Sequence, residues 1–248
     1  MDANTMGLSL PPRVRFALLV ALIVVVNSVA GVLSTGGPAT GWLILPWLIT
    51  IVLIVLCFAI IGQVPPIVDW RGVLVDQRNK MSLSRLQLVV WTILVISATI
   101  TEGVLNAVWG QKTPLNLSIP SELWILLGLS TGAFVAAPLV LDNKADQGTL
   151  HTKPLNHHAW SDIFYGDDTG NADQVDFSKV QQFFFTVVLT VVYAAGLGNV
   201  MATTTPGPQA LLHFPPLDPG FIGIMAVSQL AYIAYKAVPQ NKTDAPPD

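Results

Sequence analysis

Long apolar stretches without charged residues alternate with short polar segments along this chain. A helix needs about 20 mainly apolar residues to cross the roughly 30 Å hydrocarbon core of a bilayer. Six stretches come close to this length or exceed it, and the fifth begins with a cluster of phenylalanines. The pattern therefore predicts six transmembrane helices, at residues 16–34, 41–61, 86–108, 122–141, 182–201 and 221–238.

Composition supports the same class of protein. Hydrophobic residues make up 52% of the 248 residues and charged residues 11%, against about 25% charged in an average soluble domain. So few charges cannot cover the surface of a soluble protein of this size, so we expect an all-α integral membrane protein. The net charge of -3 gives no reason to expect nucleic acid as a partner. One cysteine and four scattered histidines offer no zinc-type spacing, and we predict no metal or cofactor.

The distribution of basic residues predicts the orientation. With six spans, eleven of the twelve Lys and Arg residues fall on the side of both termini, and Lys112 falls on the other. The positive-inside rule then places both termini and segments 63–85 and 142–181 in the cytoplasm. A second interpretation concerns the first stretch: Arg13 and Arg15 before an apolar run also fit a cleavable signal sequence, which would leave five spans.

The second half of the chain repeats a helical-hairpin pattern. The segment 82–87 matches 176–181 at an offset of 94, and the return stretches match at an offset of 98, which aligns Ser130 with Ser228. Both copies would run in the same direction through the membrane. We therefore expect an N-terminal hairpin, two homologous hairpins with a small cytoplasmic loop layer, and a disordered tail, at residues 1–62, 63–141, 142–239 and 240–248.

Each of the two related hairpins opens with the same polar motif. Its serine or aspartate can cap the helix, and its basic residue lies at headgroup level, where long side chains anchor to lipid headgroups. Its glutamine is too polar for lipid and should face another helix or the second glutamine. Packing and anchoring explain the motif; a polar path or a lipid-headgroup site is the alternative. These residues are Ser82, Arg85, Gln87, Asp176, Lys179 and Gln181.

Three further polar residues lie within the predicted spans. Ser130 and Ser228 occupy matching positions near the middle of the membrane, beside small residues that let helices approach closely. Glu102 is the one carboxylate well inside a predicted span, about two turns from its outer end. Helix packing and an interfacial position explain these residues. The alternative is a polar lining, with Glu102 handling protons or cations.

The loop 142–181 is rich in aspartate and also carries aromatic residues. Residues 166–171 look like a calcium loop, but the EF-hand spacing and its final glutamate are missing, so divalent-metal binding is a weak alternative. The apolar content predicts that the loop packs against segment 67–78 or a neighbouring subunit. The candidate partner-contact residues are Trp70, Trp160, Phe164 and Tyr165.

The opening Ser-Leu-Ser-Arg-Leu-Gln with the following Trp-Thr, and the Gly-Leu-Ser of the return stretch, carry a resemblance. They resemble a group of bacterial multi-pass membrane proteins of unknown activity, over about residues 69–239. The resemblance implies a bacterial inner membrane protein. It implies no ligand and no catalytic residue.

Three function classes remain. The first is a non-enzymatic, oligomeric membrane component: a scaffold, or a sensor that couples a cytoplasmic partner to the membrane. Its expected partners are membrane lipids and either further copies of itself or other subunits of a membrane complex. The second is an ion channel lined by the polar residues Gln87, Gln181, Ser130, Ser228 and Glu102. A secondary transporter ranks lower, because the repeat is parallel and buried charge is scarce. No nucleophile elbow, phosphate loop or dinucleotide fingerprint predicts an enzyme.

Overall fold

The computed structural model describes residues 11–35, 41–63, 65, 67–146, 148–206 and 212–238. These residues form α-helices and two short 3-10 helices, with isolated β-bridges and no β-strand in the described part of the chain. Six helices are long and apolar enough to cross a membrane, which confirms the predicted all-α class. The tail predicted at 240–248 lies outside the described residues. The helices are α1 (Pro12–Ser34), α2 (Ile44–Gly62), α3 (Leu83–Val108), α4 (Ser121–Ala145), α5 (Phe177–Thr203) and α6 (Pro219–Ala237).

A side-chain cap marks the beginning of α5 and is missing at α3. The Asp176 carboxylate accepts hydrogen bonds from the backbone N–H groups of Ser178 and Lys179, at 2.9 and 3.4 Å, so α5 starts well before its apolar stretch. Ser82 occupies the matching position at α3, but its side chain makes no capping bond. Its hydroxyl instead lies 3.0 Å from the hydroxyl of Ser84. The capping prediction is therefore confirmed for Asp176 and wrong for Ser82.

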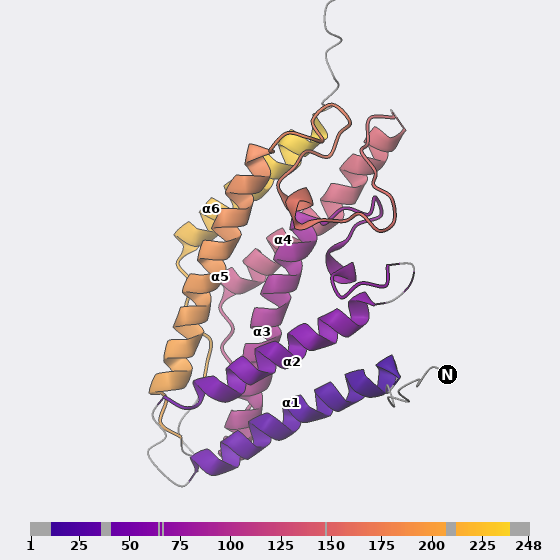
Figure 1. Ribbon diagram of the computed structural model, residues 1–248. Coiled ribbons are helices and arrows are strands. Elements are labelled where there is room, and N and C mark those ends of the chain that lie inside the picture. Colours follow the sequence, from indigo (N-terminus) through magenta and orange to yellow (C-terminus); the bar gives the residue numbers. More distant parts are fainter. Residues whose placement is uncertain are drawn as a thin grey trace, which may run out of the picture.

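Helix α3 is the centre of the bundle. It packs against α1, α2, α4 and α5, while α6 packs against α4 and α5. Helices α3 to α6 thus form a four-helix bundle, and the α1–α2 hairpin leans across one side of it at an angle (Figure 1). At one end of the bundle lies a small polar layer, made of the segments 67–82 and 148–176 (Figure 1). We call this layer the cap.

Three groups of apolar side chains form the interior. The largest fills the bundle around Trp91, and a smaller one joins α1 to α2 through Ile23 and Ile54. The third lies in the cap, where Leu74 and Ile163 pack beside the start of α3. The cap therefore has an apolar core of its own.

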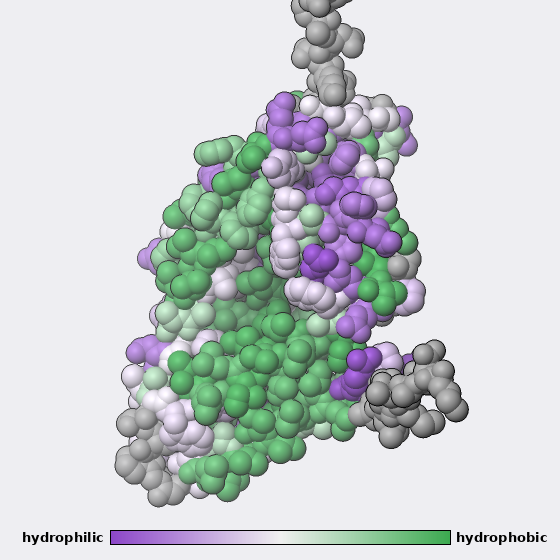
Figure 2. Space-filling view, in the orientation of Figure 1, coloured by the Kyte–Doolittle hydropathy of each residue, from purple (hydrophilic) through white to green (hydrophobic). Residues whose placement is uncertain are grey.

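The outer surface of the helices is strongly apolar. Large side chains such as Leu33, Leu139 and Val191 are more than 60% exposed. Figure 2 shows a broad hydrophobic face over the helices, with hydrophilic residues concentrated at the cap. A contiguous apolar patch of this extent is far larger than a soluble monomer carries, and it fits a multi-pass membrane protein.

Buried positions in α3 and α5 test the register of the proposed duplication. Gln87 and Leu94 are buried in α3, and Gln182 and Leu189 are buried in α5, which aligns the two helices at an offset of 95. The sequence match lies at 94, and one residue rotates a helix by about 100°. The duplication itself stays a prediction.

Candidate functional site

The two segments of the cap pack directly on each other. The Lys153 N–H donates to the Arg78 carbonyl at 3.2 Å, and the Met81 N–H donates to the Asp162 carboxylate at 3.3 Å. The imidazole of His158 lies 2.7 Å from the Asp69 carboxylate. These contacts confirm that the acidic loop packs against the segment between α2 and α3.

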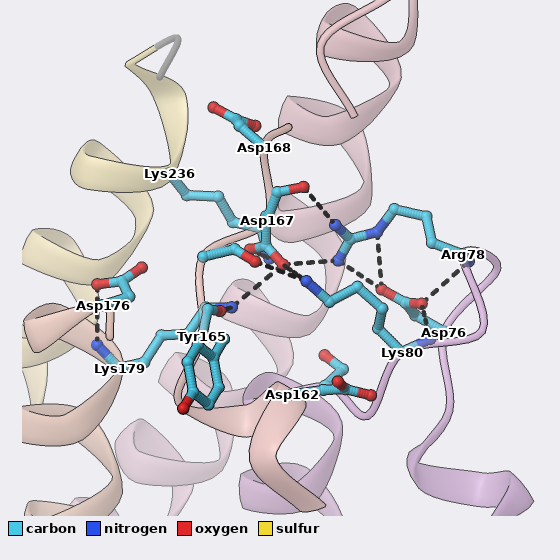
Figure 3. Close-up of polar contacts among 12 residues, drawn as sticks. Asp76, Arg78, Lys80, Asp162, Tyr165, Asp167, Asp168, Asp176, Lys179 and Lys236 are labelled. Atoms are coloured by element: carbon cyan, nitrogen blue, oxygen red, sulfur yellow. Dashed lines mark hydrogen bonds and ion pairs between the residues drawn. The ribbon is translucent and has the colours of Figure 1, made fainter. Parts of the chain in front are cut away.

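Asp167 lies at the centre of the cap, and four cations converge on its carboxylate (Figure 3). Its Oδ1 is 3.0 Å from the Arg78 guanidinium, 3.1 Å from Lys179 Nζ and 3.8 Å from Lys80 Nζ. Its Oδ2 is 3.1 Å from Lys236 Nζ. The cluster therefore joins the loop before α5 to the other cap segment, to the start of α5 and to the end of α6.

Electrostatics keep Asp167 ionised. Burial by itself would raise the pKa of this carboxyl, but Lys236, Lys179, Arg78 and Lys80 together outweigh burial and hold the pKa well below its usual range. Burial lowers the pKa of Lys80 to about 8, because attraction to Asp167 offsets only part of the desolvation and the neighbouring cations oppose a further charge. A carboxylate held in this way is a poor proton acceptor. Its arrangement suits cross-linking of segments.

Further contacts tie the cap to the helix ends. Lys144 Nζ, on α4, contacts the Asp168 carboxylate at 2.8 Å and donates to the Val238 carbonyl at 2.8 Å. Lys80 Nζ donates to the Gly166 carbonyl, and Lys179 Nζ donates to the Tyr165 carbonyl, both at 2.6 Å. Lys80, Lys144 and Lys179 thus each contact the loop between α4 and α5.

The two residues predicted as lipid-headgroup anchors lie in different surroundings. Lys179 is buried in the Asp167 cluster. Arg85 is half-buried, with its guanidinium 5.4 Å from the ring centre of Phe134 on α4. Arg85 and Lys179 occupy matching positions in the sequence, but they make different contacts in the two hairpins.

The two predicted glutamines are not brought together. Gln87 is fully buried in the bundle, whereas Gln181 lies on the exposed face of α5. The neighbouring Gln182 takes the inner position and donates from Nε2 to the Gln87 Oε1 at 2.7 Å. The amide of Gln87 lies 3.3 Å from the sulfur of Met225 on α6. Three helices therefore meet at Gln87.

The other predicted membrane residues are all buried. The Ser130 hydroxyl donates to the Leu126 carbonyl at 3.0 Å within its own helix. Both oxygens of Glu102 and the hydroxyl of Ser228 find no hydrogen-bond partner among the described residues. Glu102 is fully buried on α3, so it does not lie at an exposed helix surface.

Two of the four candidate partner-contact residues lie at the surface, and the other two are partly buried. The rings of Trp70 and Trp160 lie 6.3 Å apart and are about half exposed, so the two cap segments present one aromatic surface. Phe164 points inward and packs edge-on against Phe183 of α5, with ring centres 4.9 Å apart. Tyr165 is half-buried beside the Asp167 cluster (Figure 3).

Sequence reasoning missed the Asp167 cluster. The aspartates at 167 and 168 drew notice only as part of a calcium-like loop. Of the four cations, only Lys179 had a predicted role besides setting the orientation, as a lipid-headgroup anchor. In the structure these opposite charges neutralise one another, and no group of three metal-ligating side chains occurs in the described residues. The available signal was an excess of aspartates in one cytoplasmic loop, matched by lysines at the adjoining helix ends.

Comparisons with known proteins do not supply a function: no protein-family model, no curated protein and no solved structure matches this chain.

Proposed function

We propose that this chain is a non-enzymatic component of a bacterial inner membrane, which couples a partner bound on its cytoplasmic cap to its membrane helices. The observation that carries the proposal is the ion-pair cluster at Asp167. It links both cap segments to α5 through Lys179 and to α6 through Lys236. A force or displacement applied to the cap therefore passes to the helices through buried contacts.

The surface formed by Trp70 and Trp160 fits a protein partner. Tryptophan and arginine are enriched among the residues that dominate binding energy at protein interfaces. Here the Arg71 guanidinium lies 5.8 Å from the Trp70 ring centre, and an ion pair with Asp69 at 2.6 Å holds the arginine in place. The aromatic pair is thus presented on a rigid base, which lowers the entropy cost of binding.

Purification in mild detergent followed by native mass spectrometry tests this proposal. We expect the wild-type chain to retain a stoichiometric partner, either a second copy of itself or another protein. The double variant Trp70→Ala/Trp160→Ala should lose it, because truncating one such residue costs about 2 kcal/mol or more, roughly 30-fold in affinity.

The matched control is Trp124→Ala, which removes an exposed tryptophan at the opposite end of the bundle. It should keep the partner. A wild-type chain that purifies alone and monomeric, or a double variant that retains its partner, would contradict the proposal.

A specific observation also favours a second candidate, an ion channel. Buried polar groups nearly always have a partner, which can be water or an ion. Glu102, Ser228 and Gln229 have side-chain atoms without one among the described residues. Ion flux from liposomes that disappears in Glu102→Ala and Ser130→Leu would favour this candidate over the first.

A further inference from the structure

A cavity of about 260 Å³ opens where the cap meets the membrane helices. It lies between the start of α3, the cap end of α4 and the loop that follows α4. One wall is polar and the opposite floor is apolar. The floor comes from α4 and consists of Phe134, Ala137, Pro138 and Leu141.

The polar wall carries charges of both signs. Arg78 and Lys236 line the cavity and also belong to the Asp167 cluster. In that cluster four cations face Asp167, Asp76 pairs with Arg78 at 2.6 Å, and Asp162 also attracts Lys80. Asp76 and Asp142 line the cavity as well. The cations of the cluster are therefore already offset, and a negative group in the cavity needs a further cation.

The start of α3 adds donors to the same wall. Ser82 and Ser84 line the cavity, and no side chain caps the first backbone N–H groups of α3. At α5 the Asp176 carboxylate fills the equivalent place. The beginning of a helix favours an anion, through its N–H groups and its dipole.

Arg85 is the cation best placed to bind a ligand. It lines the cavity and forms no ion pair with any residue that the structure describes. Its contact with the Phe134 ring holds the guanidinium between the polar wall and the apolar floor. The planar guanidinium matches the geometry of a phosphate group and can donate two parallel hydrogen bonds to it.

We propose that this cavity binds a phosphate ester, with the phosphate between Arg85, Ser84 and the start of α3 and an apolar part against Ala137 and Pro138. A phospholipid headgroup and a soluble phosphate ester share this chemistry. The lipid source is supported by the adjoining surface of α4, where the apolar side chain of Leu139 is 62% exposed. The proposal goes beyond the partner surface and does not depend on it.

The test measures lipid binding by the full chain. The protein is placed in nanodiscs of phosphatidylcholine with phosphatidylglycerol and is then released. Native mass spectrometry counts the lipids that the released protein retains. Wild type should retain phosphatidylglycerol, and Arg85→Gln should weaken its binding at least about tenfold, the effect of losing a charge-assisted hydrogen bond. Ala137→Phe fills the floor without changing any charge and should weaken binding as well.

The matched control is Arg15→Gln, which removes an exposed arginine at the start of α1. A second arm offers glycerol phosphate to lipid-stripped protein. Binding of glycerol phosphate that depends on Arg85 supports the site and assigns it to a soluble ester; binding from nanodiscs alone assigns it to a lipid. Equal losses in Arg15→Gln and Arg85→Gln would show general attraction to an anionic surface and overturn the proposal. Unchanged binding in both Arg85→Gln and Ala137→Phe would also overturn it.

Discussion

The Asp167 carboxylate accepts contacts from side chains that lie far apart in the sequence, on the segment before α3, on α5 and on α6. Lys179 and Lys236 are buried and the Arg78 side chain is only 10% exposed, so these cations lose most of their hydration when the cap folds. Asp167 is the carboxylate that these cations share. We therefore expect its charge to contribute strongly to the stability of the cap.

Asp167→Asn should destabilise the protein by about 3–5 kcal/mol, because it leaves buried cations without their counter-ion. Thermal unfolding in detergent measures the change. The matched control is Asp173→Asn, an exposed aspartate of the same loop, which should alter stability by less than about 0.5 kcal/mol.

The pH dependence gives the same prediction a second measurement. The folded pKa of Asp167 lies below the unfolded value of about 3.9. Its contribution is therefore fully present above pH 4 and is lost as the pH falls through the folded pKa. The gap between wild type and Asp167→Asn should stay constant near neutral pH and close in acid. A gap that is absent at pH 7 would refute the role given to Asp167.

At the scale of the helices, the sequence predicted the six apolar helices well and their ends at the cap less well. Helix α5 begins at Phe177 and α3 at Leu83, both ahead of their apolar stretches. Hydropathy cannot detect these extensions, because they contain polar residues. Polar side chains such as that of Lys179 are in contact with the cap and not with lipid. The cap also depends on pairing between Asp167 and residues such as Lys236, which no local pattern reveals. The long-range ion pairs of the cap therefore could not be predicted from the sequence.

The contact between α3 and α5 shows most clearly where the register in the structure differs from the register of the sequence motif. Gln87 and Gln181 match in the sequence motif, yet Gln182 makes the contact with Gln87. The sequence of a long apolar helix gives little indication of which face turns inward, because lipid and the interior of a helix bundle are both apolar. The glutamine pair at 181 and 182 left two registers possible, and packing selected one.

Substitution at these neighbouring positions separates the two registers. Gln182→Leu should destabilise the bundle by about 1 kcal/mol, within the range measured for hydrogen bonds between membrane helices. It also leaves the Gln87 oxygen without its donor. Gln181→Leu should be neutral or stabilising, because an exposed leucine faces lipid more favourably than an amide. Unfolding of both variants in mixed micelles measures the difference, and the reverse order would favour the register of the sequence motif.

For the whole molecule, six membrane-spanning helices would place the cap, the start of α1 and the end of α6 on one side of the membrane. The structure adds that the cap is packed and not an open loop, since Lys144 and Lys179 are buried. Trypsin should therefore cut the cap slowly, even when it is added on the side of the membrane where the cap lies. Cysteine labelling is the better measure of orientation, and the single native cysteine, Cys57, is buried in α2.

In a Cys57→Ser background, Asp173→Cys places a thiol on the exposed surface of the cap, and Leu115→Cys places one at the opposite end, where Leu115 is 80% exposed. The excess of basic residues on the cap side predicts that the cap faces the cytoplasm. A membrane-impermeant maleimide added to intact cells should therefore label Leu115→Cys, and should label Asp173→Cys only after the membrane is opened. Labelling of both from outside would contradict the six-span layout. Labelling of Asp173→Cys alone would keep the layout and reverse the orientation, which would place the Trp70 and Trp160 surface outside the cell.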